Sequence, residues 1–258
     1  MSLNHFIKSS FPWWIIEPII YFKYLGKRIP NHNSYIQELK NKSGVEIGGP
    51  STVFKRILPI YPIISSLDGV NFASQTVWEG DISCGNTFAY YANKKGRQYI
   101  ADATDLPEIA DKCYDFLLSS NCIEHIANPI KALIEWKRVL KSGGVLVLVA
   151  PNKESNFDHR RNFTSIEHFI QDYQRDTQES DMTHLDEILE CHDLNRDPRA
   201  GSLSSFRERS LNNYNNRTLH HHVFNIDTLS QILMYSGFEI LTHSITRHDF
   251  FIMARKVS

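Results

Sequence analysis

The side chains best suited to moving a proton concentrate in the second half of the chain. Most of its twelve histidines fall in the last third, where His220, His221 and His222 are consecutive. His125 stands apart from them, directly after an apolar run. Because a neutral imidazole accepts a proton near neutral pH, we predict that His125, His220 and His221 are catalytic. The alternative, that these histidines pack against a sheet or cap a turn, stays open.

Metal-ligand side chains also recur on one face of a predicted helix. This face carries His184, Glu187 and Cys191, with Asp181, Asp186 and His192 nearby. Together with the histidine triplet, such side chains could ligate a divalent ion. Leu185, Ile188 and Leu189 already give the helix an apolar face, and we therefore predict no metal.

Two adjacent arginines offer a different chemistry. Arg160 and Arg161 lie in the stretch DHRRNF, residues 158–163. Guanidinium groups bind carboxylate or phosphate through paired hydrogen bonds. We predict that both arginines bind the substrate, and a solvated basic turn is the alternative.

A glycine turn follows the first apolar run, in the stretch GVEIGGPST at residues 44–52. Gly48 and Gly49 lack side chains, so the backbone there can approach a ligand closely. The dinucleotide pattern G-x-G-x-x-G is absent, and so is the lysine of a phosphate-binding loop.

Polar residues end three further strand-like runs. Asp68 ends residues 61–68 and lies about 20 residues after the turn, where an acid commonly holds ribose hydroxyls. Asp102 ends residues 97–102, and Ser119 lies at the end of residues 114–120. The carboxyl ends of parallel strands meet at one edge of a sheet, so we expect these residues to share a ligand cleft with the glycine turn.

The order of elements indicates an α/β fold. Apolar runs alternate with helical patterns, as in a parallel sheet with right-handed crossovers. We expect a Rossmann-like, mostly parallel sheet with helices on both faces, an antiparallel C-terminal strand pair and a helical insertion after the fifth strand. The predicted parts are an aromatic-rich arm or lid (1–40), a core (41–151 and 222–258) and a helical cap for substrate binding (152–221).

The run YDFLLSSNCIEHIANPIKALIEWKRVLKSGGVLVLVAPNK, residues 114–153, resembles the second half of a class I S-adenosylmethionine-dependent methyltransferase domain. VEIGG resembles the first motif of that family, and ADATDLP its third-strand motif. The family usually reads acid-x-G-x-G at the turn, and Pro50 stands here in place of the second glycine. The resemblance implies that the backbone at Gly48 and Gly49 faces the methionine part of the cofactor, with Glu46 supporting the turn.

The same resemblance assigns the other edge residues. It implies that Asp68 holds the ribose diol, that Asp102 and Ala103 frame the adenine, and that Ser119 lines the methionine side. The function that it implies is transfer of a methyl group from S-adenosylmethionine to a small or medium polar acceptor, such as a sugar or another hydroxylated metabolite. The alternatives are an oxidoreductase with a nucleotide cofactor and a non-catalytic binding module with the same fold.

Composition limits the partners. The chain carries 28 basic and 29 acidic residues, so bulk charge gives no reason to expect a nucleic-acid partner. Its four cysteines are widely spaced, which fits reduced thiols in the cytoplasm. The apolar segment at residues 11–22 is shorter than the about 20 residues that cross a bilayer. For this segment a packed helix, a lid, a homodimer contact and a membrane-surface contact remain open.

Overall fold

The computed structural model describes residues 29–257. The predicted arm therefore lies mostly outside the described residues, as does the whole apolar segment 11–22. Within the described part, the first element is helix α3, His32–Leu39. Among the helices of residues 29–257, none has the length and apolarity that a bilayer-spanning helix requires.

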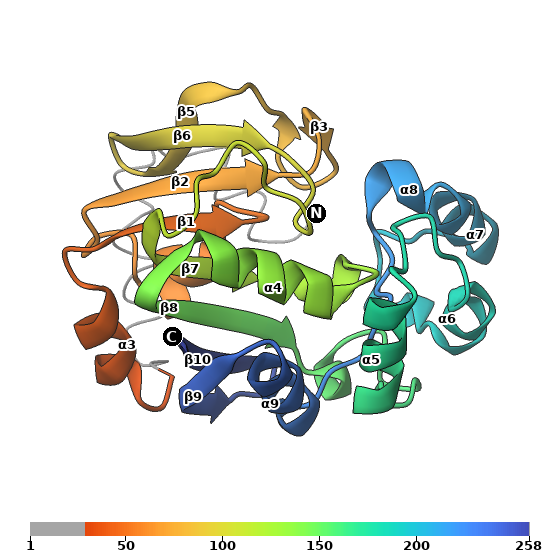
Figure 1. The fold of residues 1–258 in the computed structure, drawn as a ribbon. Coiled ribbons are helices and arrows are strands. Elements are labelled where there is room, and N and C mark those ends of the chain that lie inside the picture. The colour runs from red at the N-terminus through yellow and green to blue at the C-terminus, as the bar shows by residue number, and fades with distance from the viewer. Residues whose placement is uncertain (1–28, 258) are drawn as a thin grey trace.

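One eight-stranded sheet organises the core (Figure 1). Its strands are β1 (Ser43–Ile47), β2 (Ser66–Asn71), β5 (Gly85–Tyr91), β6 (Lys94–Ile100), β7 (Tyr114–Ser120), β8 (Leu140–Pro151), β9 (Phe238–Ile245) and β10 (Asp249–Lys256). They lie in the order β5-β6-β2-β1-β7-β8-β10-β9. The five central strands, from β6 to β8, pair in parallel. β10 runs antiparallel to β8 and β9, which confirms the predicted fold class with its C-terminal strand pair.

Alternation along the central strands places apolar side chains on both faces of the sheet. On β7, Leu117 packs with one hydrophobic cluster, and Phe116 and Leu118 pack with the other. Helices α4 (Pro129–Val139) and α9 (Ile226–Tyr235) cover the first face. α3 and the segment after the glycine turn cover the second. A strand buried on both faces must be apolar throughout, which is why β7 and β8 are readable from sequence.

Two parts of the core differ from the sequence-based expectation. The run at 61–68 is not a strand over its length, because β2 starts at Ser66 and continues to Asn71. β5 pairs antiparallel with β6 at the far edge of the sheet, where no strand was predicted. A short ribbon of β3 (Gln75–Thr76) and β4 (Gly80–Asp81) precedes it.

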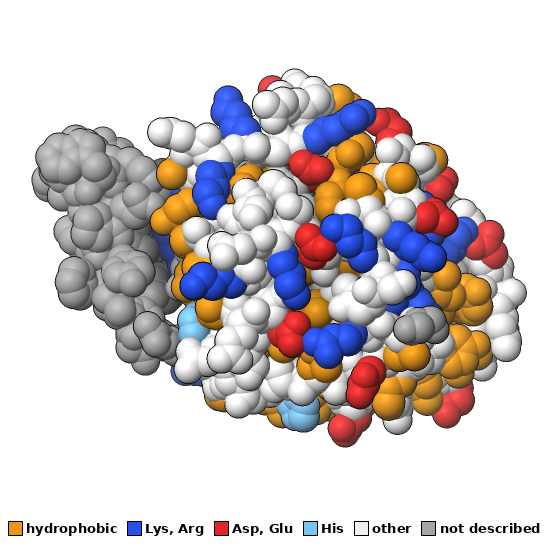
Figure 2. Space-filling model, turned by 60° about the vertical axis from the view of Figure 1, so that its left-hand side comes forward, with side chains coloured by type: hydrophobic (Ala, Val, Ile, Leu, Met, Phe, Trp, Pro, Cys, Tyr) orange, Lys and Arg blue, Asp and Glu red, His pale blue; other side chains and the backbone are white. Residues whose placement is uncertain are grey.

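The segment between β8 and α9 is helical. It contains α5 (Ile166–Gln174), α6 (Leu185–Cys191), α7 (Leu203–Leu211) and α8 (Asn213–Asn216), with short 3-10 turns at Lys153–Ser155 and Leu194–Arg196. Figure 1 shows α6, α7 and α8 gathered beyond one end of the sheet, whereas α5 packs against α4 and α9. We keep the name cap for residues 152–221. On the face shown in Figure 2, lysine and arginine side chains are interspersed with acidic ones.

Candidate functional site

A cleft of about 540 Å³ lies between the carboxyl edge of the parallel strands and the cap. This volume is in the range of about 300–1,000 Å³ that is usual for small-molecule sites. Four segments of the core line it, namely the glycine turn, the end of β2, residues 101–103 after β6 and residues 120–126 after β7. The cap contributes residues on the opposite wall, among them Phe157, Glu179, Arg199, Arg217 and His220.

The two glycines of the turn serve different purposes. Gly48 has φ of +77° and lines the cleft, and an added Cβ would lie 3.0 Å from the sulfur of Cys122. A side chain at Gly49 would instead meet the Glu46 carboxyl carbon at 2.3 Å. The peptide bond from Gly49 to Pro50 is cis. Gly48 therefore lets the backbone turn beside the cleft, and Gly49 lets the turn pack onto Glu46.

Glu46 lies behind the turn and does not line the cleft. Its carboxylate accepts hydrogen bonds from the Ser51 backbone N–H at 3.0 Å and from the Tyr61 hydroxyl at 2.6 Å. Complete burial raises the pKa of Glu46 to about 8, although both hydrogen bonds favour the charged form. The backbone of the turn is thus held from behind by a buried carboxyl group.

Asp68 is not at the edge of the sheet. It lies three residues before the end of β2, and its carboxylate accepts from the Arg97 backbone N–H and the Tyr114 hydroxyl, both at 2.7 Å. The position at the cleft belongs to Asn71, whose side-chain amide donates to the Gly49 carbonyl at 3.0 Å. The expectation that Asp68 ends its strand was wrong, and its position gives no support to the predicted ribose role.

The fourth strand ends at Ser120 as predicted, whereas the third ends at Ile100, two residues before Asp102. Asp102 and Ala103 line the cleft, and one Asp102 oxygen accepts from the backbone and hydroxyl of Thr104. Ser119 is completely buried and does not line the cleft, whereas Ser120 does. The cleft-facing position at the end of β7 is therefore one residue later than predicted.

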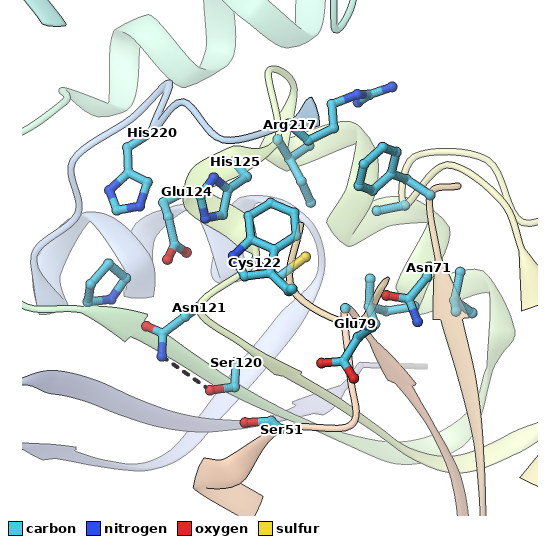
Figure 3. Close-up of a pocket in the computed structure, with 18 of the residues that line it drawn as sticks. Ser51, Asn71, Glu79, Ser120, Asn121, Cys122, Glu124, His125, Arg217 and His220 are labelled. Carbon is cyan, nitrogen blue, oxygen red and sulfur yellow. Dashed lines mark hydrogen bonds between the residues drawn. The ribbon is translucent and has the colours of Figure 1, made fainter. Parts of the chain in front are cut away.

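Three titratable side chains meet at the cleft wall, and we name Glu124, His125 and His220 the cleft cluster. Figure 3 shows them side by side among the residues that line the cleft. Their ligand-type atoms lie within 4.8 Å of one another. Glu124 and His125 belong to the 3-10 turn after β7 (Ile123–His125), and His220 comes from the end of the cap. Nearly a hundred residues of sequence separate His125 from His220, and the fold brings the two side chains together.

The surroundings give the three groups different proton affinities. Burial raises the pKa of Glu124 to about 7, and its Oε2 has no hydrogen-bond partner among the described residues. Burial and the neighbouring His220 lower the pKa of His125 to about 3, and its Nδ1 lies 3.0 Å from the Leu219 carbonyl. Burial alone would lower the pKa of His220, but Asp158, 2.5 Å from its Nδ1, raises it. Glu124 is thus the group poised near neutral pH.

Three predicted site residues lie outside the cleft. His221 is buried, its ring nitrogen meets the Asn213 side chain at 3.1 Å, and it does not line the cleft. Arg161 is 2% exposed and donates to the carbonyls of His220 and His221. Arg160 lies 3.6 Å from Asp193 on the outer surface. These positions give no support to the catalytic role predicted for His221 or to the substrate-binding role predicted for Arg160 and Arg161.

Sequence reasoning missed other residues that line the cleft. Arg217 pairs with Glu179 at 2.6 Å and with Asp102 at 3.1 Å, which ties the cap to the core. Arg199 also lines the cleft, and its guanidinium has no ion pair among residues 29–257. Glu124 lies in the stretch IEH, residues 123–125, and an acidic residue soon after the fourth strand could have been predicted to line the cleft. Nothing in the sequence marks the contacts of Arg199 and Arg217.

Comparison with known proteins finds a family match in the middle of the chain. A family described as "Methyltransferase domain" matches residues 69–148, which contain β6, β7, α4 and most of β8. The match covers less than half of the chain, and within it the chain is similar to the class I S-adenosylmethionine-dependent methyltransferases. The match begins after the glycine turn, so the geometry of the turn is independent of it. The resemblance read from residues 114–153 is confirmed.

Individual relatives are distant. An S-adenosylmethionine-dependent methyltransferase from Mesorhizobium loti has the same fold, with 14% identity, a TM-score of 0.52, and coverage of 88% of this chain and 96% of its own. An uncharacterized protein from Methanocaldococcus jannaschii is 41% identical over 61 residues, which is 24% of this chain. That match spans 26% of the relative's length, about a quarter.

The cofactor of this methyltransferase family is S-adenosylmethionine, and the charges of the cleft fit it. Four carboxyl groups line the cleft against two guanidinium groups. Burial raises the pKa of Glu79, Glu124 and Glu179, which shows that the protein's own cations do not fully compensate these acids. A ligand that carries a sulfonium and an ammonium group supplies the missing positive charge. A pyrophosphate would add to the negative charge.

Proposed function

We propose that the protein transfers a methyl group from S-adenosylmethionine to a hydroxyl oxygen of a small polar acceptor. The observation that carries this proposal is the position of the cleft cluster, which shares one cleft with Gly48, Asn71 and Asp102. The cofactor, when bound, supplies an activated methyl group. An oxygen acceptor must in addition lose a proton, and a base beside it accelerates the transfer by about 100–10,000-fold.

Glu124 is the proposed base. Its carboxyl group is 1% exposed, has an oxygen without a hydrogen-bond partner in the described part of the chain, and has a pKa of about 7. Efficient bases titrate close to the working pH. The acceptor hydroxyl gives its proton to Glu124 as the new bond between oxygen and the methyl carbon forms.

His220 is the proposed hydrogen-bonding partner of the acceptor. Asp158 holds its Nδ1 at 2.5 Å, and Arg161 donates to its backbone carbonyl at 2.7 Å. These contacts fix the orientation of the ring. We propose that Arg161 acts only through this support, which replaces the direct substrate contact predicted for it.

The acceptor is proposed to carry an anionic group besides its hydroxyl. Arg199 is exposed at the cleft and has no ion pair within residues 29–257, so it can bind a carboxylate or phosphate. Trp78, whose ring lies 5.2 Å from that of His125, adds an apolar surface to the cleft. Hydroxy acids and sugar phosphates have this combination of groups.

For the cofactor itself, we propose that Asn71 and Glu79 contact the ribose. Both line the cleft near the end of β2. They replace Asp68 in the role that the family resemblance implied for it. Asp102 and Ala103 keep the adenine role, and the backbone at Gly48 keeps the methionine role.

Calorimetry and a labelling screen test the proposal together. Wild-type protein should bind S-adenosylhomocysteine but not NAD, and should transfer labelled methyl to at least one anionic hydroxylated compound. Glu124→Gln should keep the affinity for S-adenosylhomocysteine and lose the transfer. His243→Gln, at an exposed site outside the cleft, is the matched control.

Two outcomes would reject the proposal. NAD binding without S-adenosylhomocysteine binding would favour the oxidoreductase. The structure already disfavours that alternative, because the segment after the turn is a π-helix of only 5 residues and offers no long helix N-terminus to a pyrophosphate. Cofactor binding with no transfer to any acceptor pool would favour the non-catalytic binding module.

A further inference from the structure

A second group of ligand-type side chains lies inside the cap, away from the cleft. Its members are His168 and Asp172 on α5, His184 at the start of α6, and His222 just after the cap, and we name them the cap cluster. None of the four lines the cleft. The metal-ligand atoms of the three histidines lie within 4.8 Å of one another.

Three distances within the cap cluster are close to those between neighbouring ligands of one ion. His168 Nε2 lies 3.0 Å from His184 Nε2 and 3.2 Å from Asp172 Oδ2. His222 Nε2 lies 3.0 Å from the same Asp172 oxygen. Ligand atoms bound at about 2.0–2.1 Å in a tetrahedron are about 3.3 Å apart. Hydrogen bonds between two ring nitrogens and one shared carboxylate would satisfy these groups only in part.

His222 can offer an ion either ring nitrogen, Nε2 beside Asp172 or the unpartnered Nδ1. The residue is 1% exposed, and its Nδ1 is buried without a hydrogen-bond partner among the described residues. Buried polar atoms are nearly always satisfied. On the other side, His184 Nδ1 lies 3.6 Å from the Glu187 carboxylate, the kind of outer contact that orients a ligating imidazole.

We propose that His168, Asp172, His184 and His222 bind one divalent transition-metal ion, most favourably zinc, which holds the cap together. Three imidazoles and one carboxylate match the ligand preferences of zinc and disfavour magnesium or calcium, which take oxygen ligands. Four protein ligands complete the tetrahedron, so the site is structural and leaves no position for a substrate.

The architecture of the cap gives this ion a purpose. The hydrophobic cluster inside the cap contains only four buried residues (Ile188, Ala200, Phe206 and Leu219). Small units with little buried apolar surface often depend on a metal. The ligands come from α5, from the start of α6 and from the segment that also carries Arg217 and His220 to the cleft. The ion would join these three segments at one point.

The sequence-based expectation of no metal concerned a different set. That set centred on His184, Glu187 and Cys191, and did not include His168 or Asp172. His192, also considered there, stacks on Phe157 and Phe206 with ring centroids 4.4 Å and 4.0 Å away. Of the earlier set, only His184 and one member of the histidine triplet, His222, contribute ligands to the cap cluster.

Metal titration of the untagged full-length protein tests this proposal without reference to catalysis. Chelator-treated protein is titrated with zinc, and with cobalt, whose visible absorption reports tetrahedral coordination. We expect one ion per chain and a higher melting temperature with metal. His184→Gln should weaken zinc binding at least about 100-fold, and Asp172→Asn provides a second variant if the first does not fold.

Two controls keep the result specific. His243→Gln, at an exposed histidine outside both clusters, should bind zinc like the wild type. His220→Gln should also bind like the wild type, because His220 belongs to the cleft cluster. Absence of stoichiometric binding, full binding by His184→Gln, or loss of binding in His220→Gln alone would overturn the proposal.

Discussion

The cleft cluster and the cap cluster use the same residue types for different purposes. In each, histidines from distant segments meet a carboxylate that lies about fifty to sixty positions away in sequence, Asp158 for His220 and Asp172 for His222. The cleft cluster opens onto a cavity and contains a carboxyl group whose pKa is about 7. The cap cluster does not line the cleft, and its groups contact one another. Exposure to a cavity, rather than residue type, distinguishes a candidate catalytic group from a candidate structural one.

The largest expected effect is on turnover, which should fall steeply when the cleft cluster is altered and little when the cap cluster is altered. Glu124→Gln should lower the rate of methyl transfer by about 100–10,000-fold, because it removes the base and keeps the shape of the side chain. His168→Gln should retain turnover within about tenfold. Single-turnover measurements with labelled cofactor provide both values. Equal losses in the two variants would mean that the clusters act as one unit.

The pH dependence of the methyl-transfer rate should also be set by the cleft cluster alone. Glu124 accepts a proton only when it is ionised, and burial raises its pKa to about 7. The rate should therefore rise about tenfold per pH unit below pH 7 and level off above it. The profile of His168→Gln should have the same midpoint. A flat profile between pH 5.5 and 8.5 would contradict the role of Glu124.

Substitution of the two carboxylates that contact histidines, Asp158 and Asp172, should give smaller effects that can be compared directly. Asp158→Asn should lower turnover by about tenfold or more through loss of the His220 orientation, and leave zinc affinity unchanged. Asp172→Asn should lower zinc affinity by about 10–100-fold and change turnover less. Calorimetry and initial rates on the same two preparations test both. If Asp158→Asn lost zinc affinity and Asp172→Asn lost turnover, the cleft cluster would be the metal site and the cap cluster the catalytic one.

The smallest effect concerns the cofactor side of the cleft. Asn71→Ala should weaken S-adenosylhomocysteine binding about fivefold, the value of one hydrogen bond of about 1 kcal/mol. Asp68→Ala should leave that affinity unchanged, and lower the free energy of unfolding by about 1–2 kcal/mol. Calorimetry and urea unfolding measure the two quantities. Loss of affinity in Asp68→Ala would restore the ribose role that the family resemblance implied.

The sheet was predictable because its central strands carry their own signal. β7 and β8 are apolar on both faces, and the helical spacing of residues 129–139 fits α4. The end of β2 was not predictable in this way. Tyr61 and Ile64 fill the core from a turn, so their apolar character does not indicate a strand. Gly69, directly after Asp68, lies within the strand, and it is a glycine because the Phe88 ring occupies the space that a side chain would need.

The site was predictable only in part, since its contacts are long-range. Gly48, Asp102 and Ala103 line the cleft because strand ends of a parallel sheet share one edge. The directions of His220, His221 and His222 depend on Asp158, Asn213 and Asp172, respectively, which no local pattern connects to them. Arg161 looked like a substrate ligand for the same reason, because burial cannot be read from two adjacent arginines.

The bridge made by Arg217 has a consequence for engineering this enzyme. Its guanidinium joins Glu179 of the cap to Asp102 beside the proposed adenine position, and Glu179 also accepts from the Ala127 backbone N–H at 3.0 Å. A transplanted cap from another family member would need to bring an equivalent arginine and acid. Without them, Asp102 would lose its counter-charge, and a change meant to alter acceptor choice would alter cofactor affinity as well.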